Sequence, residues 1–197
     1  MTNEHADDLS RRDRARIVKT AVAPRPIAWV STKNKSGADN LAPFSSYNYV
    51  TSADPVLVMN IGEKASGEPK DTVANIRETE EFVVNIVTEE LAEQMDRTAR
   101  SIPAGESEFD YADVERAESD LVSPPRVANA AVSMECELYD TKDVYEKVMV
   151  FGEVRCFHVD DRIKTEGEID ALKLATVGRL GGPYYTGTDP LDMERSN

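Results

Sequence analysis

The chain has 197 residues, of which 40% are hydrophobic and 30% are charged, enough for one domain with a buried core. Its 37 acidic and 23 basic residues give a formal net charge of −14 at pH 7. A surface this acidic repels phosphate backbones and anionic lipids, so we expect neither a nucleic-acid partner nor a membrane partner.

No apolar run reaches the roughly 20 residues that a membrane-spanning helix needs. The first 16 residues are polar and lack the apolar stretch of a signal peptide, so we expect a cytoplasmic location. The acidic residues are spread along the chain, a halophilic composition that suits a salt-rich cytoplasm. An ordinary acidic cytosolic protein is the alternative.

The N-terminal residues predict a short helix over residues 11–18, and Pro24 and Pro26 stop any continuation. Most later elements are predicted strands, because they are β-branched and aromatic or alternate between apolar and polar residues. They lie at residues 27–32, 40–51, 56–61, 82–87, 132–139 and 148–159. The run at 56–61 is apolar throughout, which is typical of a strand buried on both faces.

Two helices are expected, one over residues 73–79 that Asp71 or Thr72 could cap, and one over residues 89–98. The irregular segment 99–126 is too long for a simple connection, so we expect a functional arm there. These elements together predict a mostly antiparallel barrel with a few helices.

Cysteine and histidine are scarce and offer no local metal motif. Cys136 and Cys156 lie in strand-like alternations and are expected to be reduced. No Cys/His cluster with metal-ligand spacing is present, so we expect no metal site. His158 is interpreted as a structural histidine, and His5 belongs to the polar lead-in.

Polar residues are dense on one predicted strand, where Asn40, Ser45, Ser46 and Asn48 lie within nine residues. They face either solvent or a polar ligand such as a ribityl chain and its phosphate. Lys70-Asp71-Thr72 precedes a predicted helix, whose N-terminus attracts a phosphate; a plain helix cap is the alternative.

Trp29 is the single tryptophan, and it shares a strand face with Ile27 and Ser31. It is either a core residue or a wall for a flat heterocycle.

Several motifs, taken in their order along the chain, resemble those of the flavin reductase-like family of FMN-binding split barrels. They are Arg25-Pro26-Ile27-Ala28-Trp29-Val30-Ser31, Asn40-Leu41-Ala42-Pro43-Phe44-Ser45, Asp54-Pro55, Lys70-Asp71-Thr72, Asn75-Ile76, Phe82-Val83-Val84-Asn85, Gly152-Glu153-Val154 and Arg179-Leu180-Gly181-Gly182. The resemblance implies a lead-in over residues 1–19, a split-barrel domain over 20–186 and a tail over 187–197.

The resemblance further implies a mostly β fold, a six-stranded antiparallel Greek-key split barrel with flanking helices, that forms a homodimer. It implies bound FMN and, as a co-substrate, NADH or NADPH. The cofactor-binding residues carried over by motif position are Arg25, Trp29, Ser31, Asn40, Leu41, Ala42, Ser45, Ser46, Tyr47, Lys70 and Thr72. No catalytic residue is expected, because hydride transfer from nicotinamide to flavin N5 is mainly the chemistry of the cofactors.

The expected activity is that of an NAD(P)H-dependent flavin reductase that passes electrons to a partner oxygenase or another acceptor. The alternative is a non-enzymatic, flavoredoxin-like FMN electron-transfer protein without a nicotinamide site. A barrel without flavin, or one related to pyridoxamine-phosphate oxidase, is a further alternative.

Overall fold

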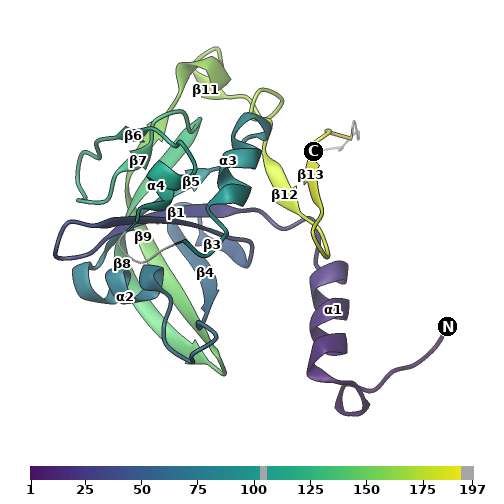
Figure 1. Cartoon of the computed structure of the whole chain (residues 1–197). Coiled ribbons are helices and arrows are strands. Elements are labelled where there is room, and N and C mark those ends of the chain that lie inside the picture. Colours follow the sequence, from purple (N-terminus) through teal and green to yellow (C-terminus); the bar gives the residue numbers. More distant parts are fainter. Residues whose placement is uncertain (103–105, 192–197) are drawn as a thin grey trace.

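The computed structural model describes residues 1–102 and 106–191. Its centre is one antiparallel sheet of seven strands in the order β2-β1-β5-β8-β9-β4-β3 (Figure 1). These strands are β1 (Ala28–Lys33), β2 (Asp39–Phe44), β3 (Tyr47–Thr51), β4 (Val56–Gly62), β5 (Glu81–Ile86), β8 (Val132–Val144) and β9 (Lys147–Val159).

Helices and short strands surround this sheet. The helices are η1 (Ala6–Asp8), α1 (Arg11–Ala21), α2 (Asp71–Thr79), η2 (Glu89–Leu91), α3 (Ala92–Arg97), α4 (Glu108–Tyr111) and η3 (Asp161–Ile163). The short strand pairs are β6 (Arg116–Ala117) with β7 (Arg126–Val127), β10 (Lys164–Thr165) with β11 (Glu168–Ile169), and β12 (Val177–Arg179) with β13 (Tyr185–Gly187).

The connection between β2 and β3 shows that the sheet is curled. These two strands form the opposite edges of the sheet, yet only Ser45 and Ser46 separate them in the chain. In a flat sheet, seven strands spaced by about 4.8 Å would place the edges roughly 29 Å apart, which two residues cannot span. The edges must therefore meet, and the predicted mostly β split barrel is confirmed, with seven strands in the main sheet where six were expected.

Alternation along β1 divides the core in two. Ala28 and Val30 point into the barrel, where they join a cluster that includes Phe82 and Val84. Trp29 points to the other face, into a second buried cluster with Leu41, Met95 and Phe109. Because α3 and α4 carry the last two residues of that cluster, the outer face of β1 and β2 is covered and not exposed to solvent.

Three local predictions are corrected by the structure. The polar stretch 40–51 is two strands, because the chain turns from one edge of the sheet to the other at Ser45 and Ser46. Strand β4 buries alternate residues and not both faces, since its second face lies partly open. Helix α2 begins at Asp71 with Lys70 as its N-cap, and no side chain caps it.

The predicted helix at 89–98 is present as η2 followed by α3. The segment 99–126, expected to be irregular, contains α4, β6 and the first residue of β7, and its residues 103–105 lie outside the described ranges. Of the tail predicted over 187–197, residues 192–197 also lie outside them. Both cysteine thiols are free. Among the described residues, no helix has the length and apolar character to cross a membrane.

Candidate functional site

A cavity of about 1220 Å³ opens between β2, the start of α2 and the segment that leads to α4. This exceeds the roughly 300–1,000 Å³ of typical ligand pockets. The residues that line it include Asn40, Ala42, Lys64, Lys70, Thr72, Thr98, Arg100, Glu108 and Arg116.

Hydrogen bonds across the sheet fix the start of α2 at this cavity. The Asn40 amide donates to the Thr72 hydroxyl at 3.1 Å, and the Asn75 amide donates to the Thr32 hydroxyl at 3.0 Å. Thr72 and Asn75 are three residues apart, so they lie on the same face of α2, and both are buried against the barrel. The helix N-terminus is therefore held in a fixed position beside β2.

Positive charge collects at the same end of α2. Lys70 is exposed, and its Nζ lies 5.7 Å from the centre of the Phe44 ring. Lys64 Nζ donates to Asp71 at 2.6 Å, and this hydrogen bond raises the pKa of Lys64. Since Lys64 neutralises the one carboxylate in the first turn, that carboxylate does not offset the positive end of the α2 dipole.

The opposite wall is built on Arg116. Its guanidinium donates to Asp39 and to Asp110, each at 2.7 Å, and to Ser107 at 2.9 Å. Glu108 accepts a hydrogen bond from the Leu41 N–H at 3.1 Å, and burial raises the pKa of this carboxyl group. These contacts hold the start of α4 against β2, and the carboxylates of Asp39 and Asp110 neutralise the charge of Arg116.

A second hollow of about 380 Å³ adjoins the first, because Pro43 and Ala99 line both. Arg25 and Ser45 line it. The Arg25 guanidinium donates to the carbonyl groups of Lys19, Val22 and Leu180. These hydrogen bonds hold the chain after α1 against the C-terminal segment.

The predicted site residues divide into four groups, of which Ser46 and Tyr47, at the bend between β2 and β3, are the last. Asn40, Ala42, Lys70 and Thr72 line the large cavity, and Arg25 and Ser45 line the adjoining hollow. Trp29, Ser31 and Leu41 are buried away from both.

Each buried residue has a partner in the fold. The Trp29 indole donates to the Thr98 hydroxyl at 2.9 Å, and the Ser31 hydroxyl donates to the Pro125 carbonyl. Trp29 itself does not line the cavity, but its partner Thr98 does.

Ser46 and Tyr47 lie at the bend between β2 and β3, outside the residues that line either cavity. The Ser46 hydroxyl accepts a hydrogen bond from the Asn60 amide at 3.0 Å. Tyr47 packs against the barrel core, and burial raises its pKa.

Sequence reasoning missed Lys64, Arg100, Glu108 and Arg116 as cavity residues. The segment around Glu108 has no periodicity that points to a site. Only its docking on β2 brings it to the cavity.

These features define a class of protein: a mostly β split barrel with a large polar cavity beside the N-terminus of a fixed helix. The model of the flavin reductase like domain matches residues 21–176, and the chain belongs to this family. The resemblance found in the motifs is confirmed, and the protein is a flavin-related oxidoreductase by family.

Similar proteins cover nearly the whole chain. A protein of Aquifex aeolicus is 42% identical over 171 residues, which are 86% of this chain and 87% of that protein. The structure of nitrilotriacetate monooxygenase component B from Bacillus cereus has a TM-score of 0.92 and 30% identity, and 98% of each chain is covered. That of 2-nitrobenzoate 2-nitroreductase from Pseudomonas fluorescens has a TM-score of 0.89 and 31% identity, with 99% of this chain and 96% of the other covered.

Proposed function

We propose that this protein is an FMN-dependent NAD(P)H:flavin oxidoreductase. The observation that carries the proposal is the convergence of the α2 N-terminus, Lys70, Thr72 and Asn40 on one cavity of about 1220 Å³. A helix N-terminus with an adjacent lysine is suited to a phosphate monoester, which FMN carries at the end of its ribityl chain.

The residues present fit FMN in charge and polarity. Lys70 and the first turn of α2 would hold the phosphate. Asn40 and Thr72 supply an amide and a hydroxyl group for the ribityl chain, and Ala42 and Pro43 supply apolar surface for the ring.

FMN, when bound, supplies the hydride chemistry, accepting a hydride from reduced nicotinamide. The protein contributes binding and alignment, and no side chain needs to act as an acid or base. Glu108 and Arg116 shape the wall of the cavity, because Glu108 is bonded to Leu41 and Arg116 to Asp39, both on β2.

We include a homodimer in the proposal because α1 buries no residue against the part of the chain that the structure describes. None of its residues is buried, and Figure 1 shows it standing away from the barrel. Ile17 and Val18 are 47% and 58% exposed. An isolated helix of 11 residues is marginal in water, so a second copy of the chain is the expected partner for this surface.

An oxygenase is the proposed electron acceptor, on the strength of the likeness to nitrilotriacetate monooxygenase component B. A cytoplasmic location completes the proposal, and the free thiols are consistent with a reducing compartment.

The test is a visible spectrum of the purified protein, followed by anaerobic addition of NADH or NADPH. Flavin absorption that bleaches rapidly after NADH or NADPH is added supports the reductase. Flavin absorption that persists contradicts it and favours the electron-transfer protein without a nicotinamide site. A protein that stays colourless after FMN is added contradicts flavin binding itself.

A further inference from the structure

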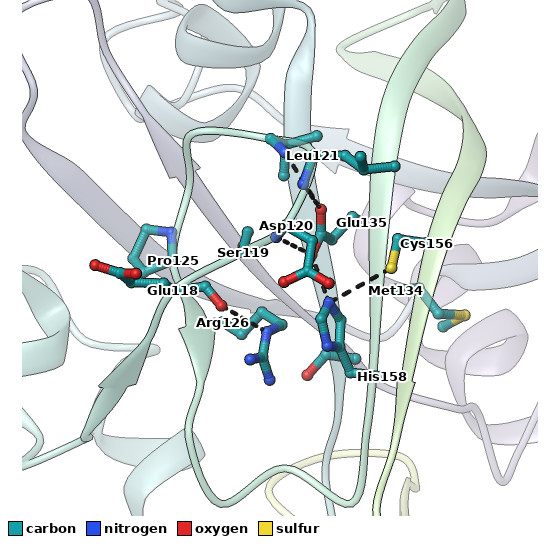
Figure 2. Close-up of polar contacts among 12 residues, drawn as sticks. Glu118, Ser119, Asp120, Leu121, Pro125, Arg126, Met134, Glu135, Cys156 and His158 are labelled. Carbon is teal, nitrogen blue, oxygen red and sulfur yellow. Dashed lines mark hydrogen bonds and ion pairs between the residues drawn. The ribbon is translucent and has the colours of Figure 1, made fainter.

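A cluster of metal-ligating side chains lies outside the two hollows. Asp120, Cys156 and His158 each place one ligand atom within 4.8 Å of those of the other two. Figure 2 shows these side chains converging between β9 and the loop that joins β6 to β7. None of the three lines either hollow, so the cluster is separate from the proposed flavin site.

Strand geometry brings the cluster together. Cys156 and His158 are two residues apart on β9, so their side chains leave the same face of the sheet. Glu135 on β8 is the register partner of Cys156 and therefore shares that face. The three side chains form one patch although β8 and β9 contribute them separately.

Glu135 also explains why Asp120 lies over this patch. Its carboxylate accepts hydrogen bonds from the backbone N–H groups of Asp120 and Leu121, both at 2.7 Å, and of Val122 at 3.2 Å. The Glu135 side chain is fully buried. The loop is thus fixed by its backbone, which leaves the Asp120 carboxylate free to face His158 and Cys156.

One of the distances matches a tetrahedral transition-metal site. Cys156 Sγ and His158 Nε2 are 3.6 Å apart. Two such ligands on one tetrahedral Zn²⁺ ion, with bonds of about 2.3 and 2.05 Å, are separated by about 3.6 Å. Glu135 Oε1 lies 2.5 Å from the same Nε2. An increase of this distance by less than an ångström would place Oε1 as a fourth ligand.

The ligand atoms of the cluster and its charge indicate which metal ion it would bind. Thiolate and imidazole ligands favour Zn²⁺ over Mg²⁺ or Ca²⁺, which prefer oxygen. The Asp120 and Glu135 carboxylates beside the thiol and imidazole add negative charge, which a divalent cation offsets. Arg126 is the nearby cation, but its Nε donates to the Glu118 carbonyl at 3.0 Å.

We propose that Asp120, Cys156 and His158, with Glu135, form a structural Zn²⁺ site that pins the β6–β7 loop to the barrel. This departs from the absence of a metal site expected from the sequence, where residues 120 and 156 are too far apart to form a motif.

The test is calorimetric titration of the flavin-loaded protein with Zn²⁺, together with the absorption spectrum of the protein loaded with Co²⁺. We expect one ion per chain, a thiolate-to-cobalt charge-transfer band and a higher melting temperature with Zn²⁺. Cys156→Ser and Asp120→Asn should each weaken Zn²⁺ binding at least tenfold while the flavin content stays unchanged. His5→Ala, which removes the other histidine in the exposed lead-in, is the matched control and should bind as the parent does.

Binding of less than one ion per chain overturns the proposal. So does binding that Cys156→Ser leaves unchanged and that gives no charge-transfer band, because exposed carboxylates of this acidic surface would then be collecting the ion.

Discussion

The Asn40 amide donates to the Thr72 hydroxyl at 3.1 Å, and this bond joins β2 to the first turn of α2 across 32 residues of sequence. The two residues come from motifs that are individually weak, a polar strand and a helix start. Their contact places the positive end of α2 beside the polar edge of β2. In the proposed function, one ligand therefore has its phosphate at the helix and its polar chain along the strand.

Lys70→Ala should weaken FMN binding about tenfold, or ~1.4 kcal/mol, because one charge-assisted phosphate contact is lost while the amides of α2 remain. Lys70 is exposed, and water screens its charge, so a larger effect is not expected. Titration of the apoprotein with FMN measures the change. Lys142→Ala, which removes an exposed lysine that lines neither hollow, is the control. Equal FMN affinity in the two variants would contradict phosphate binding by Lys70.

Trp29→Phe should lower the free energy of unfolding by about 1–3 kcal/mol, because a buried hydrogen bond and packing volume are lost. Trp29 is fully buried and lines neither hollow, so FMN affinity should change less than about threefold. Urea unfolding and FMN titration measure the two effects. A large loss of FMN affinity with unchanged stability would show that Trp29 contacts the flavin directly.

Gly152→Ala should destabilise the barrel by about 2 kcal/mol or more, through overpacking. A Cβ atom at position 152 would lie 2.1 Å from Cζ of Phe82, which is fully buried. Chemical unfolding measures the loss. Phe82→Leu added to Gly152→Ala makes room for the new methyl group and should restore part of the stability, whereas strictly additive losses would contradict the steric explanation.

Glu108→Gln should make stability less dependent on pH in the mildly acidic range. Burial raises the pKa of Glu108 above its unfolded value near 4.3, so the folded state holds this proton more tightly. The native protein should therefore lose stability, relative to the variant, as the pH rises from about 4 through the folded pKa. Unfolding free energies measured across this range test the prediction.

Glu115→Gln, which removes an exposed carboxylate, controls for the change in net charge. A difference between the native protein and Glu108→Gln that stays constant with pH would contradict the burial argument.

Potassium chloride should raise the melting temperature by roughly 4–8 °C between 0.05 and about 0.5 M, which corresponds to about 2 kcal/mol. The net charge of −14 disfavours the compact state through self-repulsion, which salt screens. Surface ion pairs are screened too, but each contributes little. A melting temperature that is independent of KCl would contradict the halophilic interpretation. Sucrose at matched osmolality controls for effects other than screening.

The sequence by itself determined the fold class and the family. The strands were visible because period-2 alternation and β-branched residues are local properties, as in the stretches that became β8 and β9. The order of motifs indicated the flavin reductase-like family, which the match over residues 21–176 confirms. The single polar stretch 40–51 could not be divided correctly, because the turn at Ser45 and Ser46 follows from closure of the barrel, and two serines in a polar stretch do not by themselves mark a turn.

Only the tertiary structure decided which site residues meet. It brought Asn40, Lys70 and Thr72 to one cavity and turned the guanidinium of Arg25 to backbone carbonyl groups. It also added Glu108, which no periodicity marks, and assembled Asp120 with Cys156 and His158. These contacts join residues far apart in sequence, and their positions follow from sheet register and loop anchoring, which local patterns do not contain.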